Sequence, residues 1–137
     1  MKSWFFVVIA FCSASSWAEN SFEDECDDGL KTTNEAAVCF DGYAQNKRAL
    51  VEKHYAAALA RMPEKANDTR STRSQLRLEH AAWEAYFDEH CEFHGGMSEG
   101  ASSWINLAAV RCRLEELDAR IAFLQDVPWN QERMPES

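Results

Sequence analysis

Residues 90–94, with the sequence His-Cys-Glu-Phe-His, hold the residue types with the clearest capacity for chemistry. His90 and His94 would share one face of a helix, where their imidazoles and the Glu92 carboxylate could bind a metal ion. The cysteine between them could act as a nucleophile if its thiol were free. No distant third metal ligand is evident, however, and the glycine pair that follows would unwind a helix here. We therefore expect no metal, no cofactor and no catalytic residue in this segment.

The state of the Cys91 thiol depends on the compartment, and the N-terminus of the chain indicates export. Lys2 provides a positive start, residues 4–11 are all apolar, and residues 16–18, Ser-Trp-Ala, place small side chains where signal peptidase cleaves. Eight apolar residues are too few for a membrane-spanning helix, which needs about 20. We predict that residues 1–18 are a cleaved signal peptide. The rest of the chain is then secreted or periplasmic, without a membrane anchor.

Export makes disulfide bonds the best explanation of the cysteines. Cys12 is lost with the signal peptide, and four cysteines remain: Cys26, Cys39, Cys91 and Cys112. They are 13, 52 and 21 residues apart, without the closely spaced pair that is typical of a zinc site. An even number of cysteines in an exported chain indicates two disulfides, for which three pairings are possible.

The acidity of the chain restricts the partners that it can attract. Its formal net charge is −9, and loss of Lys2 with the signal peptide makes it −10. Such a protein is repelled by nucleic acid phosphates and by anionic lipid headgroups, and it attracts basic proteins. We therefore expect a basic protein partner and no nucleic acid.

The spacing of apolar residues predicts an all-α domain over residues 19–127, followed by a tail at residues 128–137. Three long helices are expected over residues 43–62, 71–91 and 102–125. Short connections favour antiparallel neighbours, so we expect these helices to form a small bundle stapled by disulfides.

A short N-terminal helix is expected before the three long ones. Thr32 and Glu35 have the spacing of a capping box, in which the two side chains satisfy N–H groups at a helix start. Cys39 and the turn residues Asp41 and Gly42 would end this helix. The prediction is thus a short helix plus three longer ones.

The helix at residues 102–125 has the clearest pattern, and it predicts the disulfide pairing. Its apolar residues recur at steps of three and four, as in a coiled-coil seam: Leu107, Val110, Leu114, Leu117, Ile121 and Leu124. Cys112 lies on the opposite side of this helix, and Cys91 closes the helix before it. An antiparallel hairpin would bring these two cysteines together. The predicted disulfides are therefore Cys91–Cys112 and Cys26–Cys39.

The preceding helix carries an apolar stripe of its own, made by Leu76, His80, Trp83, Phe87 and His90. Trp83 is the largest side chain of the stripe, and we expect it to anchor the core against the seam. His80 lies on the same stripe and is expected to be a core histidine rather than a ligand.

Residues 80–91, His-Ala-Ala-Trp-Glu-Ala-Tyr-Phe-Asp-Glu-His-Cys, resemble the central motif of the LprI-type lysozyme inhibitor family. Four residues stand at the spacing of that motif: Trp83, Tyr86, Asp88 and Cys91. The likeness covers residues 26–124 through further matches at Cys26, Thr33, Glu35, Cys39, Tyr55, Cys112, Arg120 and Leu124. The sequence departs from the motif where His80 replaces a glutamine, Phe87 an arginine and Leu117 a threonine.

The resemblance implies a secreted or periplasmic protein that binds lysozyme and inhibits it without catalysing a reaction. Many lysozymes are strongly basic, so an acidic inhibitor would associate with them faster. One alternative is a periplasmic interaction module, such as an immunity or accessory protein with another target. A metal-binding enzyme that uses His90 and His94 is the less favoured alternative.

The loop at residues 92–103 is the predicted place of partner contact, because loops on rigid scaffolds commonly carry binding function. It is glycine-rich and bears Glu92 and Glu99. Glu89 and Asp41 belong to the same end of the predicted bundle, so negative charge would gather there. The alternative interpretation of this loop is a connection without function.

Overall fold

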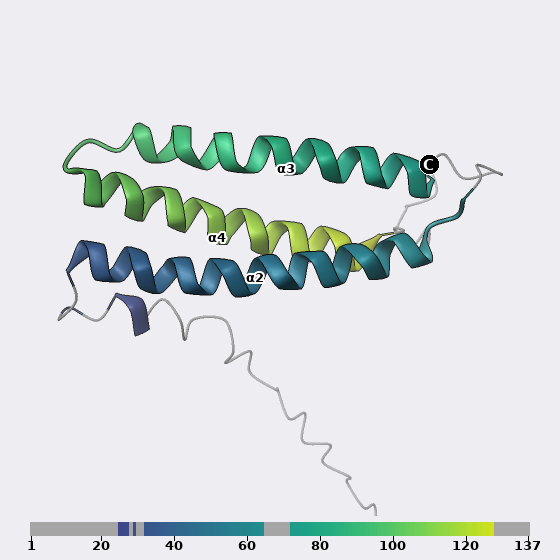
Figure 1. The fold of residues 1–137 in the computed structure, drawn as a ribbon, viewed down its shortest axis with the longest axis horizontal. Coiled ribbons are helices and arrows are strands. Elements are labelled where there is room, and N and C mark those ends of the chain that lie inside the picture. The colour runs from purple at the N-terminus through teal and green to yellow at the C-terminus, as the bar shows by residue number, and fades with distance from the viewer. Residues whose placement is uncertain (1–24, 28, 30–31, 65–71, 128–137) are drawn as a thin grey trace, which may run out of the picture.

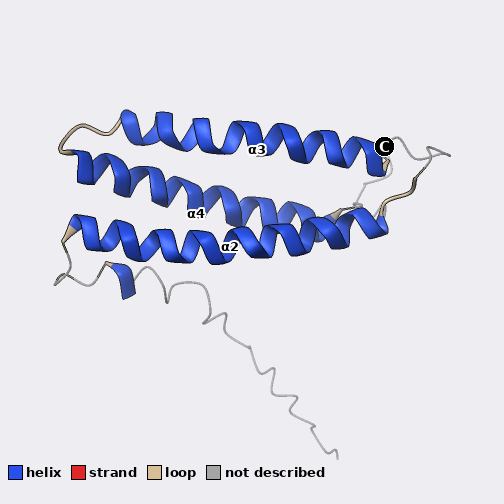
Figure 2. Ribbon diagram, in the orientation of Figure 1, coloured by secondary structure: helices blue, strands red, loops and turns tan. Residues whose placement is uncertain are grey.

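The computed structural model describes residues 25–27, 29, 32–64 and 72–127, which form three long helices and contain no strand (Figures 1 and 2). The helices are α2, Thr33–Arg61, α3, Arg73–Gly96, and α4, Ser102–Asp126. The predicted all-α architecture is confirmed within these residues. None of their helices is long and apolar enough to cross a membrane. The predicted signal peptide and C-terminal tail lie outside the described residues.

Helix α2 is continuous where the sequence predicted two helices. Thr32 caps it as expected: its hydroxyl accepts from the Glu35 N–H, and the Glu35 carboxylate accepts from the Thr32 N–H at 2.7 Å. The predicted turn at Asp41 and Gly42 is wrong, so the short N-terminal helix is not a separate element. A glycine inside a helix costs about 1 kcal/mol. Burial of the nearby Phe40, which is 1 % exposed, contributes more than that.

Helices α3 and α4 begin and end close to their predicted bounds, with one exception. Thr72 caps α3 together with the Gln75 side chain in a second capping box. The exception is the C-terminal end of α3, which continues to Gly96 instead of ending near Cys91. The loop before α4 therefore spans only residues 97–101, and the prediction of an irregular segment is wrong for residues 92–96.

Helix α4 lies between α2 and α3 (Figure 1). The seam is buried at Leu107, Val110, Leu114, Leu117 and Leu124. Helix α4 packs on α3 through Ala109, Cys112 and Arg120, whereas α2 and α3 make few contacts with each other. In Figure 1, α2 and α3 lie furthest apart at the end that holds the α3–α4 loop. We call this half of the molecule, residues 32–44 and 86–113, the open end.

Both predicted disulfides are present, and both lie in or next to the open end. Cys91–Cys112 joins α3 to α4 with its Cα atoms 5.5 Å apart. Cys26–Cys39 ties the segment before α2 to that helix, with its Cα atoms 5.6 Å apart. Each link should stabilise the fold by about 3 kcal/mol on the chain-entropy estimate. The two disulfides therefore restrain the start of α2 and fix α3 against α4.

The close approach of α3 and α4 beside Cys91–Cys112 depends on Gly95. A Cβ atom on this residue would lie 2.8 Å from the Cβ of Ala109 and 2.8 Å from the carbonyl oxygen of Ile105. Neither atom belongs to a flexible side-chain end, so α4 itself would have to shift. The adjacent Gly96 has no atom within 4 Å of the corresponding position.

We expect Gly95→Ala to lower the free energy of unfolding by about 1–3 kcal/mol, the usual cost of overpacking. Gly96→Ala, in contrast, should leave it unchanged or raise it by less than about 1 kcal/mol, since alanine is the better helix former. Urea denaturation followed by circular dichroism compares the two variants. Equal midpoints would show that the α3–α4 contact does not need a glycine.

Candidate functional site

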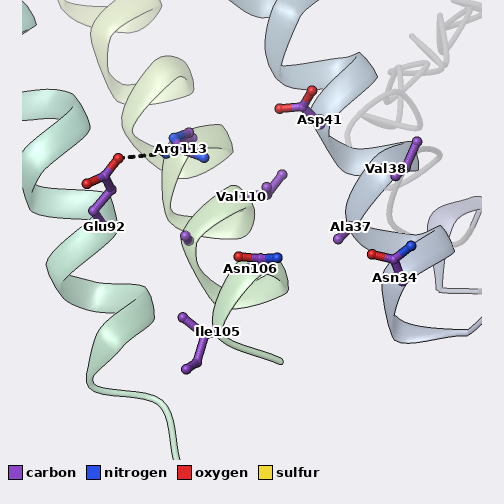
Figure 3. Close-up of a pocket in the computed structure, with 10 residues that line it drawn as sticks. Asn34, Ala37, Val38, Asp41, Glu92, Ile105, Asn106, Val110 and Arg113 are labelled. Atoms are coloured by element: carbon purple, nitrogen blue, oxygen red, sulfur yellow. Dashed lines mark ion pairs between the residues drawn. The ribbon is translucent and has the colours of Figure 1, made fainter. Parts of the chain in front are cut away.

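An open hollow of about 500 Å³ lies at the open end, over α4 and between α2 and α3 (Figure 3). Helix α4 supplies its floor, α2 one wall, and Glu92 of α3 the other wall. Its apolar lining consists of Ala37, Val38, Ile105, Ala109 and Val110. Because the side chains here are small, they leave the space between α2 and α3 unfilled.

Charged groups stand on both walls of the hollow. The Glu92 carboxylate lies 3.9 Å from the Arg113 guanidinium on the α3 side. The Asp41 carboxylate points from α2 toward α4 (Figure 3) and accepts a 2.8 Å hydrogen bond from the Gln45 amide. No cation of the described residues pairs with Asp41.

The four carboxylates predicted for partner contact all belong to the open end. Asp41 and Glu92 line the hollow, whereas Glu89 lies exposed on α3 and Glu99 lies exposed in the loop. Glu92 was expected in a loop, but it belongs to α3. The sequence thus predicted the acidic side chains at this end. It missed the hollow itself, because small residues such as Ala37 carry no chemical signal.

Arg120 is the polar centre of the other half of the molecule. Its side chain is 4 % exposed and donates two hydrogen bonds, 2.5 and 2.7 Å long, to the Glu79 carboxylate. A third contact, of 2.8 Å, joins it to His80 Nδ1. The rings of Trp83 and Phe123 each lie 4.9 Å from its central carbon. Because these groups compensate a buried cation and join α3 to α4, Arg120 supports the fold and is not accessible to a partner.

His80 is a buried core histidine, as predicted, and its neighbours fix its proton. A guanidinium can only donate, so His80 Nδ1 must accept from Arg120. The neutral ring then carries its proton on Nε2, which lies 3.9 Å from the Glu52 carboxylate. The Tyr55 ring stacks on the imidazole at 3.7 Å. Burial lowers the pKa of His80 below 6.5, and the Arg120 charge lowers it further, against smaller opposing effects of three nearby carboxylates.

One cluster in the described part of the chain has the composition of a metal site. It consists of Glu52, His80 and Glu84, whose ligand atoms lie within 4.8 Å of one another. The imidazole ligand would have to be Nε2, because Nδ1 accepts from Arg120. A metal ligand must be deprotonated, yet Nε2 carries the ring proton, and the Arg120 cation repels a second cation. This cluster does not fit a metal ion.

The segment at residues 90–94 is engaged in structural contacts. Cys91 forms a disulfide and offers no thiolate. His90 stacks on Tyr86 with ring centroids 4.6 Å apart, and its Nε2 lies 3.7 Å from Glu116. His94 lies exposed in the last turn of α3. Cys91 and His90 are thus engaged in structural contacts.

Sequence reasoning missed one motif at residues 96–100, Gly-Met-Ser-Glu-Gly, which fits the G-x-S-x-G pattern of hydrolase nucleophiles. In hydrolases this pattern occupies a sharp turn from a strand into a helix. Here it ends α3 and continues into the loop before α4, and no strand occurs in the described ranges. The Ser98 hydroxyl has no hydrogen bond to a histidine among these residues. The motif serves instead as a turn, in which Gly100 has a φ of 133° that favours glycine.

The comparison with known families agrees with this geometry. The family model described as "Lysozyme inhibitor LprI" matches residues 26–124, which is most of the chain. The chain belongs to the LprI family. No curated protein and no solved structure gives a significant match. Because LprI proteins are inhibitors of an enzyme and not enzymes themselves, the family agrees with an interaction role for this chain.

The residues shared with the LprI motif divide into two groups. Trp83 is partly buried and packs against the core, and Arg120 is buried beside it. The predicted contact of Trp83 with the seam stays a prediction. Tyr86 is 49 % exposed. Asp88 is also exposed and lies one helical turn before Glu92, which lines the hollow. The first pair therefore supports the LprI fold. Only the second pair is accessible to another protein.

His80 should make the fold less stable below about pH 6.5. At pH values above the ordinary pKa of 6.5, His80 is neutral in the folded and the unfolded chain, so its contribution to the free energy of unfolding does not change with pH. Below that pH the unfolded chain takes up the proton first, because the folded-state pKa is lower. Stability is therefore lost as the pH falls through this window, and the loss levels off below the folded-state pKa.

His80→Gln, which restores the residue of the LprI motif, should remove this part of the pH dependence. Urea denaturation of both proteins at pH 7 and at pH 5 gives the four free energies of unfolding. We expect the loss between pH 7 and pH 5 to be smaller for the variant. An equal loss in both proteins would contradict the assignment of His80 as a neutral buried group.

Proposed function

We propose that this protein is exported and inhibits lysozyme by binding it directly through the open end. The observation that carries the proposal is membership of the LprI family over residues 26–124. The position of the acidic side chains supports it, since Asp41, Glu89, Glu92 and Glu99 all belong to the open end. Such an inhibitor acts by occupying the enzyme and needs no catalytic group of its own.

The charge balance of the open end favours a basic partner. Asp88, Glu89 and Glu99 are exposed and form no ion pair with any described residue. The pair between Glu92 and Arg113 spans 3.9 Å and is largely exposed at the Glu92 carboxylate, so it is weak. Opposite surface charges speed association, and the gain fades with salt as the Debye length falls from about 10 Å at 0.1 M to about 3 Å at 1 M.

The departures from the family motif leave the accessible surface unchanged. His80, Phe87 and Leu117 are 4 %, 2 % and 1 % exposed. The rings of Phe87 and Trp83 pack with their centroids 5.0 Å apart. The Arg48 guanidinium lies 5.3 Å from the centroid of the Phe87 ring. The altered residues are thus accommodated inside the bundle. The surface available to lysozyme is set by other side chains.

The direct test adds the chain from residue 19 onward to a basic lysozyme and follows the lysis of bacterial cell walls by turbidity. We expect inhibition that increases with the concentration of the protein. An unrelated protein of equal negative charge serves as the control for non-specific attraction and should not inhibit. Undiminished lysis would overturn the proposal, and binding without inhibition would favour an interaction module with another target.

The use of the open end is tested by two double variants of equal charge. Glu89→Gln with Glu99→Gln neutralises two carboxylates at the open end, and Glu52→Gln with Glu64→Gln neutralises two in the other half. The first variant should lower the association rate with lysozyme roughly threefold or more at low salt, and the difference should vanish at high salt. Equal rates for the two double variants would place the interface elsewhere.

A further inference from the structure

The hollow at the open end is built on a restrained frame. Cys91–Cys112 fixes α3 to α4, and the close contact at Gly95 sets the distance between them. Cys26–Cys39 braces the start of α2, which forms the facing wall. The volume of about 500 Å³ lies within the range of about 300–1,000 Å³ that is usual for ligand pockets. A site formed before binding loses little entropy when a partner enters it.

Asp41 is the charged group in this hollow that pairs with no cation of the described residues. Its side chain is half-buried, and its carboxylate accepts one hydrogen bond, from the exposed Gln45 amide. No cation within the described residues pairs with it. A carboxylate that is partly removed from water is poorly compensated without a cation or several hydrogen bonds. An incoming ammonium or guanidinium group would supply the missing partner.

Arg113 does not supply that partner. Its guanidinium lies on the α3 side of the hollow, where it contacts Glu92, while Asp41 lies on the α2 side (Figure 3). The chain's own cation thus lies nearer the opposite wall, 3.9 Å from Glu92. The space beside Asp41 therefore remains open to a cation from outside.

The surface next to Asp41 suits the stem of a basic side chain. Ala37, Val38 and Val110 line the hollow with apolar groups, and Val38 is 67 % exposed. Lysine and arginine cover apolar surface with their methylene groups while the charged head reaches a polar partner. The lining and the carboxylate thus match the two parts of such a side chain.

We propose that the hollow receives one lysine or arginine side chain from the partner lysozyme. The charged group binds the Asp41 carboxylate, and the methylene groups lie on Ala37, Val38 and Val110. Glu92 on the opposite wall offsets the charge of Arg113, which also lines the hollow. This inference rests on the proposed function and names the contact through which the open end holds its partner.

The first test compares Asp41→Asn with Glu99→Gln, because each removes one negative charge from the open end. Asparagine keeps the shape of the side chain and an acceptor for Gln45, so the fold should be retained. We expect Asp41→Asn to weaken binding to lysozyme about tenfold or more, mainly through faster dissociation. Glu99→Gln should change the affinity less than about threefold, through the association rate at low salt.

The second test fills the hollow without changing its charge. Val38→Trp adds a bulky ring at the α2 wall of the hollow. Leu78→Trp adds the same ring on α3 at a residue that is 70 % exposed and does not line the hollow. Both variants should melt like the wild-type protein, since neither site is buried. Val38→Trp should weaken binding about tenfold or more, whereas Leu78→Trp should bind lysozyme as the wild-type protein does.

Lysozyme with acetylated lysines identifies the basic side chain, since acetylation removes the lysine charge. If acetylated lysozyme no longer distinguishes the wild-type protein from Asp41→Asn, the side chain is a lysine, whereas binding that Asp41→Asn still weakens assigns an arginine. If the wild-type protein binds and both Asp41→Asn and Val38→Trp bind equally well, the hollow is not the contact, and the proposed function still stands. If the wild-type protein neither binds nor inhibits lysozyme, both proposals are wrong.

Discussion

Helix α4 must bind two neighbours that barely touch each other, and this constraint determines the shape of the molecule. It packs on α2, and it carries the buried leucine-rich seam. It also packs on α3 through Cys112, through Ala109 against Gly95, and through Arg120. A helix with two buried faces leaves a strip between them that neither neighbour has to cover. The hollow lies on this strip.

The size of the side chains on α2 and α3 decides where the strip is covered. In the half that contains Arg120, the rings of Tyr55, His80 and Trp83 follow one another at 3.7 and 5.6 Å between centroids and bridge α2 to α3. At the open end the corresponding positions hold small side chains, such as Ala37. Stability and binding therefore depend on different side chains. Substitutions at buried positions, Phe40 and Gly95 of the open end among them, act on the fold, while exposed side chains of the open end can change without loss of the core.

The sequence predicted those features that depend on periodicity or on strong local signals. The regular steps of the seam defined α4, and the position of Cys112 opposite Leu114 predicted its disulfide. The turn at Asp41 and Gly42 was wrong because local turn preference is weaker than the packing of Phe40 in a long helix. The sequence predicts a helix stop at Gly95-Gly96, whereas Gly95 serves the contact with α4.

The candidate site was predictable only in part, for a physical reason. Acidic side chains are visible in a sequence, so Asp41 and Glu92 can be predicted from it. A hollow forms where side chains are small and two helices diverge, and neither condition produces a recognisable sequence pattern. The role of Arg120 was equally hidden, because one arginine looks the same whether it is buried between rings or exposed to solvent.

The order of the cysteines has a consequence for how the chain matures. Each disulfide joins cysteines that are consecutive in the chain, Cys26 with Cys39 and Cys91 with Cys112. A chain that enters an oxidising compartment from its N-terminus exposes each pair in turn, so oxidation in order of emergence gives the native links. The α3–α4 hairpin can then close through local contacts before α2 docks across a long sequence separation. If the chain is exported as proposed, native pairing therefore needs no reshuffling of wrongly paired thiols.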